Sequence, residues 1–91
     1  MPEIEIYTTP WCPFCLAARN LLDGKGVTYT EIDVMMAPGK RREMVERAGG
    51  RRTVPQIFVD GAHLGDCEEM MAMETEGVLD ARLGLTGGKS E

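Results

Sequence analysis

The sequence predicts an α/β domain in which a four-stranded mixed sheet carries helices on both faces, in the order β-α-β-α-β-β-α. A strand-like segment is followed by a helix and a second strand, a unit that closes right-handed with its strands parallel. Two short apolar runs flank Asp60-Gly61, which predicts a tight antiparallel hairpin. A chain of 91 residues accommodates one such domain.

The first half of the chain alternates between strand and helix patterns. Residues 3–8 have the two-residue hydrophobic period of a strand. A helix is expected to start at Pro13, since the first helical turn leaves N–H groups without acceptors, and to end at Gly24. Residues 27–34 are rich in β-branched side chains and predict the second strand. A second helix is predicted over residues 38–48.

The second half begins with the hairpin, whose strands are expected at residues 56–59 and 62–65. Asp66 can then cap a last helix, because its side chain can accept hydrogen bonds from the first free amides. A short terminal turn is expected around residues 78–83. We expect the domain to span residues 1–85, with a flexible C-terminal tail at 86–91.

Composition excludes several classes of function. The formal net charge is −5, which argues against general nucleic-acid binding because that requires a basic surface. No apolar run approaches the roughly 20 residues that span a bilayer, so no membrane association is expected. The first residues carry no secretory-signal pattern, and three cysteines are few for a secreted scaffold. We therefore expect a cytoplasmic protein.

Cys12 and Cys15 form a Cys-x-x-Cys pair at the predicted junction of the first strand and first helix. The amides at the start of a helix have no intrahelical acceptors and carry partial positive charge. They favour the thiolate of Cys12 over its thiol, and the thiolate is the nucleophilic form. Cys15 is expected one turn inward, where its sulfur can approach that of Cys12 to form a disulfide.

Two other interpretations of this pair stay open on the residues alone. Buried free cysteines are common, so both can be core residues. A zinc site would need four ligands, and only His63 and Cys67 remain as candidates, at a spacing that matches no ligand pattern. No metal is therefore expected.

Thr53-Val54-Pro55 precedes the first hairpin strand. Bonds before proline adopt the cis form at modest cost. A cis Val54–Pro55 bond would turn the Val54 N–H and C=O outward beside the Cys12 sulfur, where an extended peptide can pair with them as an added strand. A trans proline at the start of a strand is the alternative.

Gly65-Asp66-Cys67-Glu68 lies where the last strand meets the last helix. Free backbone amides and a helix N-terminus together favour a bound carboxylate. Simple capping by Asp66 explains the same residues and is compatible with carboxylate binding.

Cys-Pro-Phe-Cys, Thr-Val-Pro and Gly-Asp-Cys-Glu stand in the order and spacing of the glutaredoxin family, which the chain resembles over residues 3–83. The resemblance implies the thioredoxin-like fold and glutathione as co-substrate. It implies that Cys12 is the nucleophile and Cys15 the resolving cysteine, with Pro13 and Phe14 completing the catalytic motif. The glutathione-binding positions that it implies are Thr9, Phe14, Arg42, Arg51, Thr53, Val54, Pro55, Gly65, Asp66, Cys67 and Glu68.

Within that set, Thr53 and Val54 would pair with the tripeptide backbone, and Pro55 would be the cis proline. The amides of Cys67 and Glu68 would hold the γ-glutamyl carboxylate. Arg42, together with Arg51 or Arg52, would meet the glycyl carboxylate.

The chain departs from the family pattern at four positions. Phe14 replaces the commonest Tyr and loses a hydroxyl, while Thr9 stands where the family often has Lys and loses a cation. Asp66 replaces the second Gly of a Gly-Gly pair and places a negative charge beside the expected carboxylate site. Glu68 replaces a common Asp, which changes the reach of that side chain.

The resemblance implies an oxidoreductase that reduces protein–glutathione mixed disulfides and protein disulfides. Expected partners are glutathione and glutathionylated or disulfide-containing proteins, with ribonucleotide reductase as one candidate, and the chain is expected to be a monomer. Two alternatives remain: a module that binds or transfers an iron–sulfur cluster, and an electron donor reduced by thioredoxin reductase. Pro13 and Cys15 argue against the first, because relatives that hold clusters mostly have Gly at the former position and a single active-site Cys.

Overall fold

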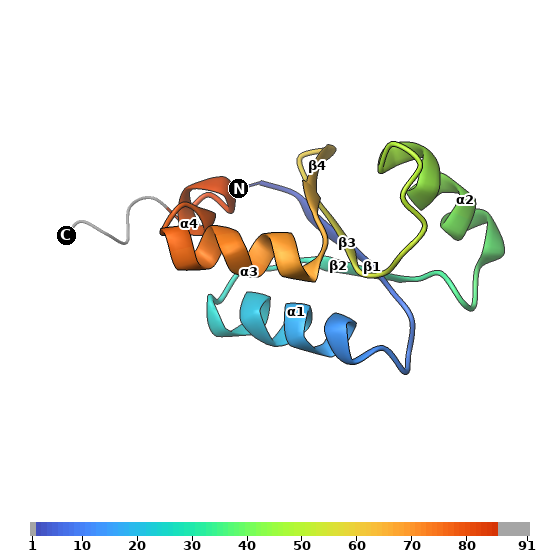
Figure 1. Cartoon of the computed structure of the whole chain (residues 1–91), viewed down its shortest axis with the longest axis horizontal. Coiled ribbons are helices and arrows are strands. Elements are labelled where there is room, and N and C mark those ends of the chain that lie inside the picture. Colours follow the sequence, from blue (N-terminus) through green and yellow to red (C-terminus); the bar gives the residue numbers. More distant parts are fainter. Residues whose placement is uncertain (1, 86–91) are drawn as a thin grey trace.

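The predicted elements appear in a computed structural model that describes residues 2–85 (Figure 1). The residues of the tail predicted at 86–91 lie outside this range. The elements are β1 (Ile4–Thr8), α1 (Pro13–Gly24), β2 (Thr30–Asp33), α2 (Pro38–Arg47), β3 (Gln56–Val59), β4 (Ala62–Gly65), α3 (Cys67–Glu76) and α4 (Leu79–Arg82).

The four strands form one mixed sheet in the order β2-β1-β3-β4. β1 pairs with β2 in parallel and with β3 antiparallel, and β3 pairs antiparallel with β4. In Figure 1, α1 and α3 lie on one side of the sheet and α2 on the other. This confirms the predicted fold class.

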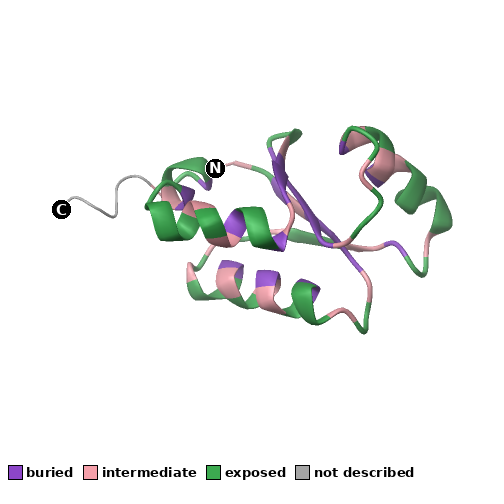
Figure 2. Ribbon diagram, viewed as in Figure 1, coloured by how far each residue is buried: buried purple, intermediate pink, exposed green. Residues whose placement is uncertain are grey.

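Alternating side chains of the central strands supply two cores, one on each face. Ile6 of β1 packs with Leu22 of α1 and Met70 of α3, and all three are fully buried. On the opposite face, Tyr7 packs with Phe58 of β3 and with Met44 of α2. Figure 2 shows buried residues along the inner faces of the helices and over the strands between them. Most of the core-facing pattern therefore follows the two-residue period that the sequence shows.

Local sequence explains where the helices begin and end. Pro13 and Pro38 each stand in the first turn of their helix, where no N–H is needed. Asp66 and Glu69 form a reciprocal capping box at the start of α3, which confirms capping by Asp66. Gly77 ends α3 with a φ of 80°, a left-handed conformation that glycine adopts without a Cβ clash.

Two predicted elements are shorter than expected. β2 covers Thr30–Asp33 rather than residues 27–34, because it is an edge strand whose partners in β1 extend only from Glu5 to Thr8. The expected terminal turn is the one-turn helix α4, and its Leu79 is fully buried. None of the helices in residues 2–85 has the length and apolarity needed to cross a bilayer.

The sheet brings three loop segments together at one end of its strands. Antiparallel pairing of Tyr7 with Gln56 places the loop after β1 next to the loop before β3. The hairpin turn at Asp60 and Gly61, both with positive φ, reverses the chain so that β4 also finishes at this end of the sheet. The two cysteines of the pair, the Val54–Pro55 bond and the start of α3 are thereby collected together.

Replacing Met44 with Ala should destabilise the fold by about 2–5 kcal/mol, because it leaves a cavity between α2 and the sheet. Urea denaturation followed by circular dichroism measures this loss. Glu46→Ala, on the exposed side of the same helix, should change the free energy of unfolding by less than about 0.5 kcal/mol. Equal effects of the two substitutions would contradict the assigned packing.

Candidate active site

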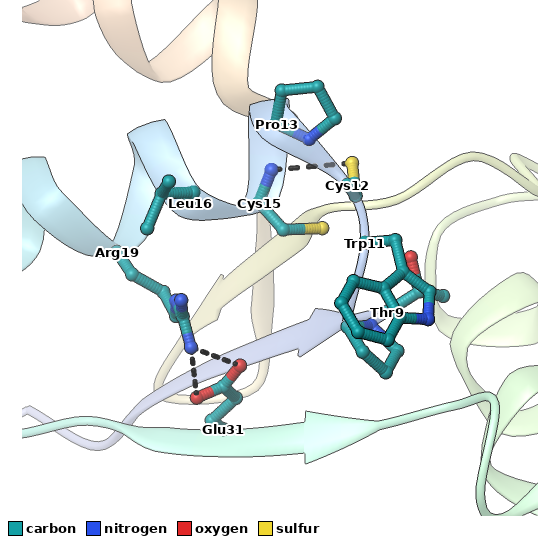
Figure 3. Close-up of a pocket in the computed structure, with 9 residues that line it drawn as sticks. Thr9, Trp11, Cys12, Pro13, Cys15, Leu16, Arg19 and Glu31 are labelled. Carbon is teal, nitrogen blue, oxygen red and sulfur yellow. Dashed lines mark hydrogen bonds and ion pairs between the residues drawn. The ribbon is translucent and has the colours of Figure 1, made fainter.

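Cys12 is the N-cap residue of α1, and its sulfur takes the place that a Ser or Asp oxygen often has. The Cys15 backbone N–H donates to Cys12 Sγ over 3.3 Å (Figure 3). Pro13 occupies the first helical position and brings no competing N–H. The predicted placement of the Cys12 sulfur against the helix amides is therefore confirmed, and this contact favours negative charge on the sulfur.

The Val54–Pro55 peptide bond is cis, as predicted. Its loop lies directly beside the first cysteine, because Cys12 Sγ is 3.8 Å from the Val54 carbonyl oxygen. A thiol can donate to that oxygen, whereas a thiolate keeps only the amide contact. The backbone of Val54 therefore lies next to the sulfur of Cys12.

Cys15 is 2% exposed, on the inner side of α1. The pKa of its thiol is raised to about 12, mainly by burial and in part by a hydrogen bond and charge repulsion from the neighbouring Cys12. Cys15 therefore stays a protonated thiol at neutral pH.

One cleft gathers most of the residues that the resemblance singled out. Its volume is about 270 Å³. The residues that line it are Phe14, Thr53, Val54, Pro55, Asp66, Cys67 and Glu68. Phe14 is 65% exposed at its rim, while Cys67 is buried and burial raises the pKa of its thiol. The structure therefore brings together segments that are separated by up to 54 residues in the chain.

The loop before β3 is held from beneath by Gln56, which sequence reasoning did not single out. The buried Gln56 side chain donates from Nε2 to the Thr53 carbonyl oxygen over 3.0 Å. Its Oε1 lies 2.6 Å from His63 Nε2, which must therefore carry the proton. The His63 ring is half-buried against Phe58, and burial lowers its pKa.

The Asp66 side chain caps α3 and also binds Arg51. Its Oδ2 accepts from Arg51 Nη2 over 2.7 Å, and Glu69 Oε1 accepts from Arg51 Nη1 over 2.7 Å. A Cβ at Gly65 would meet the Glu69 carboxylate oxygen at 2.5 Å, so this position needs glycine. No sequence signal points to the Arg51 contacts, because 15 and 18 residues separate the partners.

Two predicted residues lie in neighbouring hollows instead. Arg42 lines a hollow of about 340 Å³ with Arg41, Arg52, Pro38 and Val45. Thr9 lies on the other side of Cys12, in a hollow that Trp11 also lines and that Figure 3 shows. Trp11 is 85% exposed there. Arg19 and Glu31, which form an ion pair that the sequence did not suggest, also line this hollow.

The glutaredoxin family model matches residues 4–64, which contain both cysteines and the Thr-Val-Pro segment. Glutaredoxin 3 of Escherichia coli K12 is 45% identical over 83 residues, which are 91% of this chain and 99% of that protein. The chain belongs to the glutaredoxin family. The resemblance seen in the sequence is thereby confirmed, and membership brings thiol–disulfide oxidoreductase chemistry with it.

Solved glutaredoxins have the same architecture. The solution structure of the Brucella melitensis glutaredoxin shares 45% sequence identity and superposes with a TM-score of 0.81, covering 100% of this chain and 96% of that one. The buckwheat glutaredoxin–glutathione complex shares 26% identity with a TM-score of 0.82, covering 94% and 80%. Glutaredoxins use glutathione, and the cleft of this glutaredoxin lies beside its Cys12. Within residues 2–85 no group of three or more His, Cys, Asp or Glu side chains could hold a metal ion.

Iodoacetamide at neutral pH should alkylate Cys12 and spare Cys15 and Cys67. The latter two are 2% and 5% exposed, and burial raises both pKa values, so neither presents an accessible thiolate. Mass spectrometry of the peptides measures the order of labelling. In denaturant all three cysteines should react at similar rates. Labelling of folded Cys15 as fast as Cys12 would contradict the site geometry.

Proposed function

We propose that this glutaredoxin reduces protein–glutathione mixed disulfides and protein disulfides with glutathione as the electron donor. One observation carries the proposal: the Cys12 sulfur accepts a hydrogen bond from the Cys15 amide at a helix N-terminus, and it lies 3.8 Å from the carbonyl oxygen of Val54, which lines a cleft. The first contact favours the nucleophilic thiolate. The second and third offer a binding surface for the peptide part of an attached glutathionyl group.

The cleft offers groups suited to both ends of the γ-glutamyl-cysteine part of glutathione. Val54 can pair with the cysteinyl backbone as in strand addition. The first amides of α3, on Cys67 and Glu68, suit the γ-glutamyl carboxylate because a helix N-terminus attracts anions. The buckwheat relative in complex with glutathione supports a ligand of this kind.

The basic hollow next to the cleft suits the glycyl carboxylate. Arg42 and Arg52 line it, and Arg52 directly precedes the Thr53 of the cleft. We propose that this second carboxylate lies between the cleft and the hollow. Thr9 and Phe14 then border the ligand near the Cys12 sulfur, where neither brings a charge.

Reduction of a mixed disulfide needs only the outer cysteine. The Cys12 thiolate attacks the glutathione sulfur, a Cys12–glutathione disulfide forms, and the protein thiolate leaves and takes a proton from solvent. The thiolate of a second glutathione then attacks the glutathionyl sulfur on Cys12. Glutathione disulfide leaves, and the Cys12 thiolate returns to its place against the helix amides.

Reduction of a protein disulfide needs both cysteines. Cys12 attacks one sulfur and forms a mixed disulfide with the protein, and Cys15 then loses its proton and attacks the Cys12 sulfur. The protein leaves with two thiols, and the Cys12–Cys15 disulfide is reduced by two molecules of glutathione. Because charge on Cys12 is one cause of the raised Cys15 pKa, consuming that charge makes Cys15 more acidic at the step where it must react.

Cys15→Ser should keep the reduction of a glutathionylated peptide but abolish the reduction of a protein disulfide, since only the second reaction needs the inner thiol. Cys12→Ser should lose both activities and serves as the matched control. Release of free peptide thiol measures the first reaction, and loss of the substrate disulfide measures the second. An equal loss of both activities in Cys15→Ser would contradict the assigned roles.

A coupled assay identifies the electron donor. With a glutathionylated peptide as substrate, NADPH consumption should occur with glutathione and glutathione reductase and be absent with thioredoxin reductase alone. We expect this because the cleft and the neighbouring basic hollow offer groups for the two carboxylates of a tripeptide. Electron transfer from thioredoxin reductase would instead need an interface with that protein. Turnover with thioredoxin reductase alone would favour the alternative electron donor and overturn the dependence on glutathione.

A further inference from the structure

The start of α3 is rich in negatively charged side chains, although the proposed function requires it to bind a carboxylate. Asp66, Glu68 and Glu69 bring three carboxylates to the N-cap and first turn. Glu68 lines the cleft together with Asp66. Carboxylates near a helix N-terminus stabilise the helix, but they also oppose a further anion bound there. Some compensating positive charge is required if the helix amides are to attract a ligand carboxylate.

Arg51 supplies that charge through both ends of its guanidinium group. Nη2 donates to Asp66 Oδ2 and Nη1 donates to Glu69 Oε1, each over 2.7 Å. Two carboxylates on one turn thus share one arginine from the loop before β3. These side chains are 26–49% exposed, so the pairs also respond to dissolved salt.

The capping box leaves specific amides for a ligand. Glu69 Oε1 accepts from the Asp66 N–H over 2.8 Å, and Asp66 Oδ1 accepts from the Glu69 N–H over 2.9 Å. The amides of Cys67 and Glu68, which lie between these two, are not used by the box. Arg51 holds the two acidic side chains that complete the box, so it acts on both the charge and the shape of this turn.

We propose that Arg51 is a positioning residue that neutralises Asp66 and Glu69, so that the α3 amides keep their attraction for the γ-glutamyl carboxylate of a bound glutathionyl group. This role rests on the proposed function of the cleft. It differs from a direct salt bridge between Arg51 and a glutathione carboxylate, because both terminal nitrogens of the side chain already bind protein carboxylates.

A double-substitution experiment separates these roles. Arg51→Gln should raise the KM for a glutathionylated peptide about three- to fivefold with little change in kcat, as expected for a partly exposed charge. In the wild type, residues 51, 66 and 69 together carry a net charge of −1. The double variant Arg51→Gln with Asp66→Asn has the same net charge at these three positions. Asn also keeps the cap. The double variant should therefore return the KM to within about twofold of wild type.

Direct contact predicts otherwise, since removing Asp66 cannot replace a lost arginine. A KM that stays raised in the folded double variant would overturn the proposal, and so would an unchanged KM in Arg51→Gln. Thermal unfolding of each variant measures stability separately from binding. Neither the single nor the double variant can form the ion pair of residues 51 and 66. If the loss of that pair raised the KM only by loosening the structure, the KM would therefore stay raised in the double variant.

Two controls complete the test. Arg82→Gln removes an exposed positive charge on α4 and should leave the KM unchanged. The same peptide in a mixed disulfide with cysteinylglycine, which lacks the γ-glutamyl arm, should show no rise in KM with Arg51→Gln. An equal rise with both peptides would overturn the assignment to the γ-glutamyl carboxylate.

The outcomes also distinguish this role from the proposed function. If the wild-type protein fails to reduce the glutathionylated peptide, the proposed function is wrong. If the wild type reduces it and Arg51→Gln matches the wild type, only the role of Arg51 is wrong.

Discussion

The antiparallel pairing of β1 with β3 is the constraint on which the active site depends. With Tyr7 opposite Gln56, β1 ends where β3 begins, and so the Cys12 loop and the Val54–Pro55 loop must be neighbours. The 3.8 Å separation of Cys12 Sγ and the Val54 carbonyl oxygen is a consequence of that register. A shift by one residue would turn Tyr7 and Ile6 to the wrong faces, so the two cores enforce the position of the sulfur.

The same register places a buried polar network under the loop before β3. Gln56 is the first residue of β3 and fully buried, so its amide must find partners, and it finds them in Thr53 and His63. These bonds fix the loop from inside the protein, while Val54 of the same loop lines the cleft. Rigidity of this wall of the cleft thus comes from a core residue rather than from the residues that line the cleft.

Much of the site was predictable because its signals are local. The Cys-x-x-Cys spacing before a helix, Pro13 in the first turn, the Asp60-Gly61 turn and Asp66 as a cap each depend on a few neighbouring residues. The Arg51 contacts and the Gln56–His63 bond were not predictable, since they depend on how loops meet after folding. The short β2 shows the same limit. Residues 27–29 have strand-like side chains, but the pairing with β1 starts only at Thr30, which lies opposite Glu5.

Burial of Cys15 has two opposite consequences for the reactivity of its thiol. A deeply buried thiol is protected from solvent oxidants and from premature reaction, but burial also keeps its pKa far above neutral. The Cys12 thiolate adds to that elevation as long as it is free. In the proposed mechanism, Cys12 loses its charge once it enters a mixed disulfide while the burial of Cys15 remains, so the inner thiol becomes easier to ionise only after the outer one has reacted.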